Sequence, residues 1–218
     1  MLLSRPDSEL ELLARCKAIE GFSFAQLASA LQLIIPENPV QRKGWTGQAV
    51  EQMLGANSGN LAQPDFHHLG IELKTIPLNH LGNPKESTFI TSIPLLTLHK
   101  QTWKTSQCFS KLKKILWLPV EGDTAIAFPH RRIGRAILWT PSVEEEAILA
   151  CDWNELTLMI GTGKLAEIDA TFGQYLQVRP KAAHAKSLCY GLDEEGNKIL
   201  TLPRRFYLRT CFTGSIVC

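Results

Sequence analysis

The stretch QPDFHHLGIELKT, residues 63–75, decides the fold class because it places charged side chains inside an apolar strand pattern. Apolar and polar residues alternate from Leu69 to Ile76, which predicts a β-strand. Side chains two positions apart on a strand point the same way, so Glu72 and Lys74 project together from one face. Such a pair is either a surface ion pair or part of a functional site.

Asp65 offers a second carboxylate near this strand. Six residues separate Asp65 from Glu72, and Gly70 permits a tight bend that returns Asp65 beside Glu72. Two carboxylates and the backbone carbonyl of Leu73 suit a hard cation such as Mg²⁺. A lysine beside that ion can orient or deprotonate a water, or stabilise the charge on a phosphate under attack. This is the chemistry of phosphodiester hydrolysis, and an exposed Glu–Lys pair without a catalytic role is the competing interpretation.

The composition is that of a soluble globular protein, with 44% hydrophobic and 20% charged residues and a formal net charge of +2. Six cysteines lie far apart without a CxxC pair, which argues against a zinc knuckle or a disulfide framework and predicts reduced thiols in a cytoplasm. The first residues mix acids and bases, unlike a signal peptide. The sequence contains no run of about 18 apolar residues, so we expect no membrane-spanning helix.

Hydrophobic periodicity and capping residues predict a mixed α/β chain without a clear domain boundary. Helices are expected over residues 4–20, 23–33, 47–55 and 143–163. Strands are expected over residues 69–76, 87–96, 114–120, 124–130, 135–141 and 175–180, with strand-like segments closing the chain over 199–217. The Pro- and Gly-rich residues 34–47 are expected to form a loop that carries Lys43, and Glu51 falls in the helix that follows.

Positive charge is gathered into clusters that can neutralise phosphates, although ordinary solvated surface explains each of them equally well. The clusters are Lys111, Lys113 and Lys114; Arg131, Arg132 and Arg135; Arg179, Lys181 and Lys186; and Arg204, Arg205 and Arg209.

The PD…ExK pattern formed by Asp65, Glu72 and Lys74 is the signature of restriction-endonuclease-like nucleases. Further stretches make the whole chain resemble the MutH family of DNA mismatch repair endonucleases, in order over roughly residues 5–215. The stretches that carry this resemblance are KGWTGQAVEQMLGA, DFHHLGIELKTIP, LKKILWLPVEG, RRIGRAILW, YLQVRPKAA and ILTLPRRFYL.

The resemblance implies one nuclease domain over residues 1–218, with a restriction-endonuclease-like α/β fold. Its central mixed sheet would be flanked by helices, and two lobes would form a DNA-binding cleft. We expect residues 1–107 to form the catalytic lobe and residues 108–218 the DNA-recognition lobe.

The same resemblance implies an enzyme that nicks the unmethylated strand of hemimethylated GATC sites, on the 5′ side of the G. It would act in the cytoplasm as a monomer, with Mg²⁺ as cofactor, MutL as activator and MutS as an indirect partner. Asp65, Glu72 and the Leu73 carbonyl would bind metal, Lys74 would be the catalytic lysine, and Glu51 would hold a second ion or its waters.

Six residues would contact DNA by resemblance. Without the resemblance, the pattern favours Phe89 and Tyr207 as core aromatics of strands. In the family, the matching tyrosine senses adenine methylation, because an N6-methyl adds bulk and removes a donor in the major groove. The implied DNA contacts are Lys43, Phe89, Lys111, Arg179, Lys186 and Tyr207.

Two other functions remain open at this point. One is a restriction-type endonuclease of the same fold that cuts GATC without a partner, and the other is a non-catalytic module that binds DNA or MutL. The pair His67 and His68 lacks a third ligand at a suitable spacing, so we expect no transition-metal site there.

Overall fold

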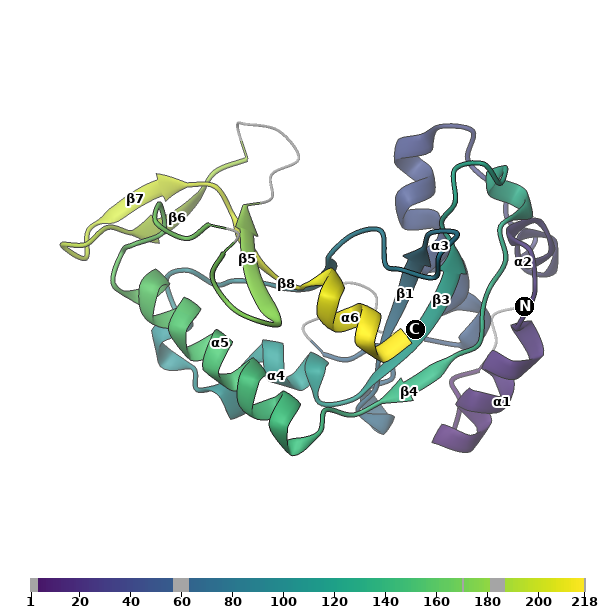
Figure 1. Cartoon of the computed structure of the whole chain (residues 1–218), viewed down its shortest axis with the longest axis horizontal. Helices are drawn as coiled ribbons and strands as arrows, with labels where there is room; N and C mark the ends of the chain where they lie inside the picture. Colours follow the sequence, from purple (N-terminus) through teal and green to yellow (C-terminus); the bar gives the residue numbers. More distant parts are fainter. Residues whose placement is uncertain (1–3, 57–62, 170, 181–186, 218) are drawn as a thin grey trace. The chain divides into compact units, whose positions relative to one another are not determined.

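The computed structural model describes residues 4–56, 63–169, 171–180 and 187–217, and the chain divides into two units (Figure 1). Unit 1 comprises Met1–Glu86, Lys113–Thr140 and Gly214–Cys218, and unit 2 comprises Ser87–Leu112 and Pro141–Thr213. The expected linear boundary between residues 107 and 108 differs from this division. The physical reason is that a sheet of unit 1 takes strands from both sides of that boundary.

Unit 1 is built on a mixed sheet of order β1-β3-β4. Strand β1 (Glu72–Leu78) runs parallel to β3 (Ile115–Glu121), which pairs antiparallel with β4 (Ile137–Trp139). The first six residues of β3 are buried, as expected for a central strand covered on both faces. The predicted strands at 69–76, 114–120 and 135–141 are therefore confirmed in kind, with shifted ends.

The predicted strand over residues 124–130 is wrong. Asp123 accepts a hydrogen bond from the Ala125 N–H, and the 3-10 helix η4 (Phe128–His130) follows this turn. Pro129, near the start of η4, lacks the N–H that a sheet ladder needs. The apolar residues of this segment pack as a loop instead, where the rings of Phe128, Phe24 and Trp45 contact one another.

Three helices precede the sheet of unit 1, namely α1 (Glu9–Ile19), α2 (Phe24–Leu31) and α3 (Pro39–Leu54). The loop expected over residues 34–47 is wrong from Pro39 onward. The Asn38 side chain accepts a hydrogen bond from the Val40 N–H, and Pro39 occupies the first helical turn, where its missing N–H costs nothing. Helix α3 therefore carries both Lys43 and Glu51, and it packs against β1 near Thr75.

The core of unit 1 lies between these helices and the sheet. Its fully buried members include Leu27, Val50 and Leu54 from the helices and Ile71 and Leu116 from the strand segments. This packing fixes α3 on β1, and β1 carries the charged pair of the opening stretch.

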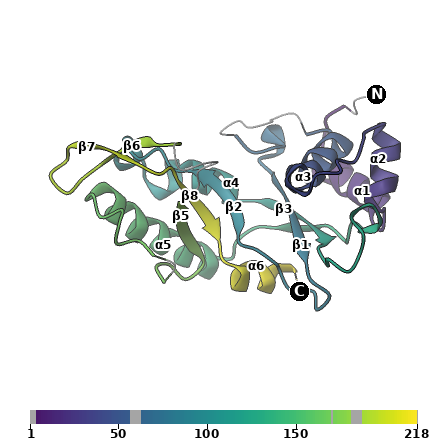
Figure 2. The same cartoon turned by 90° about the horizontal axis from the view of Figure 1, so that it is seen from above.

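Unit 2 contains an antiparallel sheet of order β2-β8-β5, drawn from above in Figure 2. The strands are β2 (Thr88–Ser92), β8 (Arg204–Leu208) and β5 (Leu176–Pro180), with β8 in the centre. Strands β6 (Cys189–Leu192) and β7 (Lys198–Thr201) form a separate hairpin. The predicted strands at 87–96 and 175–180 are thus present in shortened form.

The long helix of unit 2, α5 (Val143–Gly161), begins with a capping box between Ser142 and Glu145, as the sequence predicts. Its buried Asp152 accepts hydrogen bonds from the N–H groups of Gln174, Tyr175 and Leu176 at 2.7–2.8 Å. This carboxylate fixes the loop that leads into β5.

The shorter helices complete the chain. They are η1 (His67–Leu69), η2 (Leu98–Lys100), η3 (Trp103–Thr105), α4 (Gln107–Leu112) and α6 (Thr210–Val217). The strand-like end expected over 199–217 is wrong for α6, where Thr213 donates both backbone and side-chain hydrogen bonds to the Arg209 carbonyl, one helical turn back.

The sequence predicts neither a disulfide framework nor a membrane-spanning helix, and both features can be looked for in the described residues. Within them, Cys16, Cys108, Cys151, Cys189 and Cys211 are all free thiols. A search of the same residues found no helix long and apolar enough to cross a membrane.

Candidate active site

The bend predicted at Gly70 is present and returns the chain to β1. Phe66 and Ile71 form an antiparallel bridge with two backbone hydrogen bonds, of 2.8 and 3.2 Å. Between them lies η1, and Gly70 ends it with a φ of 66°, in the left-handed region that glycine adopts without strain. Asp65 is consequently placed directly beside the start of β1.

The Asp65 carboxylate is tied to the backbone of β1. Its Oδ2 accepts a hydrogen bond from the Leu73 N–H at 2.8 Å. The neighbouring Glu72 donates its N–H to Lys114, just before β3, at 3.1 Å. Backbone groups of successive strand residues point to opposite sides, so the Leu73 carbonyl lies on the same outer edge as Asp65.

Glu72 and Lys74 point the same way, as their spacing predicts, and their Oε1 and Nζ atoms are 2.5 Å apart. The Glu72 side chain is 1% exposed and the Lys74 side chain 15% exposed. Removing these charges from water is costly, and a buried ion pair usually adds little net stability. The arrangement is therefore typical of a functional site more than of a structural ion pair.

The oxygen atoms at this edge fit a magnesium ion. Mg²⁺ is held in proteins by one or two carboxylates together with waters and substrate phosphates, and Asp65, Glu72 and the Leu73 carbonyl supply such donors. No three His, Cys, Asp or Glu side chains within the described residues form a group that could hold a metal by themselves. Glu51 is therefore not gathered with the two carboxylates into a three-acid cluster in this structure.

The two histidines are not part of this group. His68 directs its Nε2 atom at the Pro6 carbonyl, 2.6 Å away. Because a carbonyl only accepts hydrogen bonds, that nitrogen carries the proton, and it is not oriented as a metal ligand toward Asp65.

Helix α3 supplies the other two candidate residues of unit 1. Lys43 pairs with Glu86 at 2.9 Å, and both side chains are largely exposed. Lys43 also lines a pocket with Thr46 and with Thr75 of β1. Glu51 lies one turn before the end of α3 at Leu54.

The candidate recognition residues of unit 2 share one face of its sheet. Phe89 of β2 lies opposite Tyr207 of β8, with ring centroids 5.7 Å apart at 63°. Arg179 of β5 lies opposite Arg205 of β8, two positions from Tyr207. Side chains two apart on a strand and directly opposite across strands face the same way, so these four form one surface.

The sequence pattern identified Arg205 only as a member of a positive cluster, and it did not identify Gln177 as part of this surface. The Arg205 guanidinium lies over the Phe89 ring at 5.1 Å, and its Nε is buried without a hydrogen-bond partner among the described residues. The buried Gln177 lies opposite Tyr207, donates to Ser87 at 3.0 Å and accepts from the Arg179 Nε at 3.2 Å. The period of two along β8 and β5 could have identified both from Tyr207 and Arg179.

Of the two remaining expected DNA contacts, the structure describes only Lys111. Lys111 lies in the last turn of α4, within unit 2. Lys186 lies outside the described residues, as does Lys181 of the same cluster.

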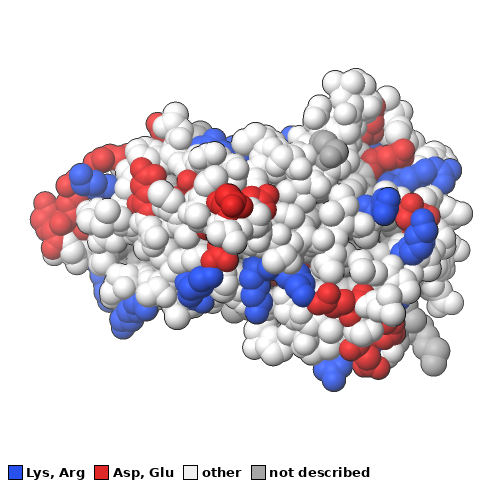
Figure 3. All heavy atoms as spheres, turned by 60° about the horizontal axis from the view of Figure 1, so that its bottom comes forward, with Lys and Arg blue, Asp and Glu red and all other residues white. Residues whose placement is uncertain are grey.

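The positive clusters divide into structural and surface residues. Arg209 donates to the carbonyls of Gly173 and Phe172 at 2.8 and 2.7 Å, which makes it a structural residue. Burial lowers the pKa of the Arg204 guanidinium from its usual range. On the face drawn in Figure 3, acidic and basic side chains are interspersed. Charge alone therefore does not identify a DNA surface on this face.

Comparison with known proteins adds independent information. A family model described as "DNA mismatch repair enzyme MutH" matches residues 54–152. The chain is 46% identical over 216 residues to the DNA mismatch repair protein MutH of Shigella boydii serotype 18, covering 99% of this chain and 94% of that protein. It is 45% identical over 216 residues to that of Escherichia coli (strain K12), with the same coverage. It is 47% identical over 212 residues to that of Vibrio cholerae serotype O1, covering 97% of this chain and 96% of that protein.

Proposed function

The chain belongs to the MutH family of DNA mismatch repair enzymes, and from that premise we propose that it is a Mg²⁺-dependent endonuclease of mismatch repair. Its substrate is double-stranded DNA with a hemimethylated GATC site, which it nicks in the unmethylated strand on the 5′ side of the G. It works in the cytoplasm as a monomer that MutL activates once MutS has bound a mismatch.

One observation carries the catalytic part of this proposal. A buried carboxylate, a partly buried lysine and a second buried carboxylate converge on one end of an edge strand, at Glu72, Lys74 and Asp65. A module that only binds DNA has no need to bury an ion pair there, because cations at the surface are sufficient to neutralise phosphates.

Asp65, Glu72 and the Leu73 carbonyl would hold the ion, and Glu51 would join when phosphate oxygens of the DNA complete a second site. When bound, Mg²⁺ supplies a Lewis acid that polarises a phosphoryl oxygen and makes a bound water more acidic. Glu72 holds the Lys74 ammonium in place through their ion pair. From that position the ammonium orients the attacking water and stabilises the negative charge that develops on the phosphate.

Recognition is proposed for the face of unit 2 that carries Phe89, Arg179 and Tyr207. An arginine suits bidentate contact with guanine O6 and N7 in the major groove. The Tyr207 ring packs against Phe89, which limits the space beside it. A tight contact between Tyr207 and adenine would reject an added N6-methyl group, which makes cleavage of the methylated strand slow.

Nicking of three DNA duplexes tests the proposal. Unmethylated, hemimethylated and fully methylated GATC duplexes are incubated with the full chain, with Mg²⁺ and then with EDTA. We expect nicks only with Mg²⁺, only in unmethylated strands, and faster with MutL present. Equal cleavage of all three duplexes would remove the methylation-sensing claim.

A second arm of this assay tests the metal assignment. Asp65→Asn retains the size of the side chain and its hydrogen-bond acceptor but loses the charge that the cation needs. The variant is expected to bind DNA and not to nick it. Nicking at the wild-type rate by this variant would contradict the metal site.

A further inference from the structure

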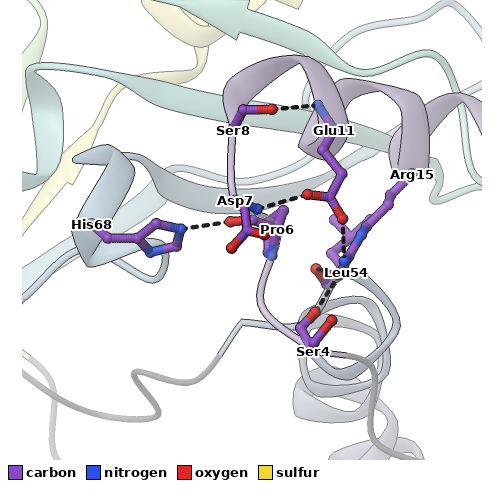
Figure 4. A network of polar contacts seen from close by, with 8 residues as sticks. All are labelled: Ser4, Pro6, Asp7, Ser8, Glu11, Arg15, Leu54 and His68. Carbon is purple, nitrogen blue, oxygen red and sulfur yellow. Dashed lines mark hydrogen bonds and ion pairs between the residues drawn. The ribbon is translucent and has the colours of Figure 1, made fainter.

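We propose that His68 and Arg15 are positioning residues of the metal site, acting through the N-terminal segment Ser4–Ser8. The inference rests on the proposed function, because it concerns the cation that Asp65 and Glu72 would hold. Figure 4 shows the contacts that connect this segment to the Asp65 turn on one side and to the end of α3 on the other.

Arg15 connects the segment to α3. Its Nη1 donates to the Ser4 carbonyl at 2.5 Å and to the Leu54 carbonyl at 3.1 Å, and its Nη2 donates to Glu11 at 2.5 Å. The last carbonyls of a helix have no partner within the helix, and a cation at this end is favourable. Arg15 therefore caps the same final turn of α3 that carries Glu51.

Gly55 shows how close this contact is. It ends α3 with a φ of 80°, and a Cβ at this position would lie 2.4 Å from the Ser4 carbonyl oxygen and 2.8 Å from Arg15 Nη1. No side chain fits there without moving the backbone of the segment. The segment and the end of α3 are consequently held in one arrangement.

His68 connects the same segment to the Asp65 turn. Its Nε2–H donates to the Pro6 carbonyl at 2.6 Å, from within η1, the 3-10 helix between Asp65 and Glu72. The Asp7 N–H next to Pro6 donates to Glu11 at 2.7 Å, and Glu11 pairs with Arg15. The polar contacts thus run without interruption from the Asp65 turn to α3.

This chain of contacts has a consequence for cation binding. His68 anchors the Asp65 turn to residues 4–8, and Arg15 holds the same residues against the end of α3. A cation held by Asp65 and Glu72 loses affinity when either contact is released, because the Asp65 turn can then shift and Mg²⁺ tolerates little deviation from octahedral geometry.

The adjacent His67 provides a matched control. It is exposed and lies in the same turn, and its side chain makes no hydrogen bond or ion pair within the described part of the chain. His68→Ala removes the contact with Pro6, His67→Ala removes a similar ring without it, and His68→Gln places an amide N–H near the position of Nε2. Lys17→Ala, which removes an exposed pair with Glu20 on α1, is the control for Arg15→Lys.

The test measures Mn²⁺ binding to each full-length variant without DNA by isothermal titration calorimetry, together with its thermal unfolding. We expect His68→Ala and Arg15→Lys to bind Mn²⁺ about three- to tenfold more weakly, the effect of losing one hydrogen bond. His67→Ala and Lys17→Ala should match the wild type, and His68→Gln should recover most of the affinity. DNA binding without metal should be the same in all variants.

The outcomes distinguish a failure of the inference alone from a failure of the proposed metal site. If wild type binds Mn²⁺ and Asp65→Asn does not, but His68→Ala binds like His67→Ala, the positioning role is wrong and the metal site stands. If the wild type itself binds no Mn²⁺, the proposed function loses its cofactor and the inference fails with it. If His68→Ala does not fold, equal affinities of Arg15→Lys and Lys17→Ala overturn the inference.

Discussion

The ion pair between Glu72 and Lys74 links the stability of the fold to the chemistry proposed for Lys74. The Glu72 carboxylate is almost completely buried and pairs with the Lys74 ammonium, so a change at either residue affects both folding and chemistry. The two effects can be separated by neutralising both partners together.

Lys74→Met should reduce nicking by about 10²- to 10³-fold, because it removes a preorganised cation from the reacting phosphate. It should also lower the free energy of unfolding by about 3 kcal/mol, because the buried Glu72 loses its ion-pair partner. The double variant Glu72→Gln, Lys74→Met should recover stability without recovering nicking. Urea denaturation and the nicking rate measure the two effects, and an equally large loss of DNA affinity would make Lys74 a phosphate contact instead.

Arg179→Ala should reduce discrimination between GATC and altered sites by about 1–3 kcal/mol if Arg179 reads a base. Arg205→Ala should be measured beside it, because Arg205 lies opposite Arg179 on the neighbouring strand and over the Phe89 ring on the same face. Competition binding with duplexes altered at each position measures the discrimination. A uniform loss of affinity across all sequences would mark Arg179 as a phosphate contact.

At the residue scale, the site in unit 1 follows from the sequence because its parts are local. Asp65, Gly70, Glu72 and Lys74 lie within one bend and one strand, where spacing determines geometry. Asp152 was missed, since its hydrogen bonds reach a loop more than twenty positions away, and no local pattern announces that contact.

At the element scale, the predicted elements differ from the structure where a helix begins at a capping residue upstream of the expected start. The segment before Thr46 looked like a loop because of its prolines and glycines, although Asn38 and Pro39 form a typical helix start. At the end of the chain, β-branched and aromatic residues favour strands, so the sequence predicts strand where the structure has α6. Burial of Phe212 in α6 overrides that local preference.

Helix α1 should contribute stability that depends on acid pH. The Asp7 N–H, and next the Arg15 guanidinium, hold the pKa of Glu11 below its usual 4.5. A carboxyl with a depressed pKa stabilises the fold above its unfolded pKa, and this contribution is lost as the pH falls through the folded pKa. Glu11→Gln should therefore flatten the decrease in unfolding free energy below about pH 4.5.

Chemical denaturation between pH 3 and pH 7 measures this slope for the wild type and for Glu11→Gln. Salt should weaken the contribution of Arg15 more than that of the backbone hydrogen bond, because mobile ions screen exposed charges. Identical slopes for the two proteins would contradict the assignment.

At the scale of the whole molecule, each unit contains a buried thiol that can report on its opening. Burial raises the pKa of Cys16 in unit 1 to about 12, and it raises the pKa of Cys108 in unit 2 as well. Reagents that react with the thiolate form should therefore modify the exposed Cys151 and Cys211 before the buried Cys16 and Cys108.

Leu27→Ala should accelerate labelling of Cys16 more than that of Cys108, because Leu27 is fully buried in the core of unit 1 and truncation costs about 2–5 kcal/mol. Leu208→Ala, in the central strand of unit 2, should reverse the order. Pulsed maleimide labelling with peptide mass spectrometry assigns each rate to its cysteine. Equal acceleration of both thiols in both variants would show that the units open together.

The division into units also explains why a linear boundary could not be predicted. Composition does not change at residues 86, 112, 140 or 213, where the chain passes from one unit to the other. Pairing of β1 with β3 across the intervening residues of unit 2 decides the division, and such long-range pairing leaves no local signal.

The central place of β8 in its sheet has a consequence for the order in which the two sheets can form during synthesis on the ribosome. The three strands that hold the Glu72 edge have been synthesised once residue 139 has emerged, whereas β2 waits for β8, whose last residue is Leu208, before it gains a neighbour in its sheet. Chains fold as units while they are made, from the N-terminal end onward. A nascent chain therefore completes the strands of the sheet that carries Glu72 well before those of the sheet that carries Tyr207.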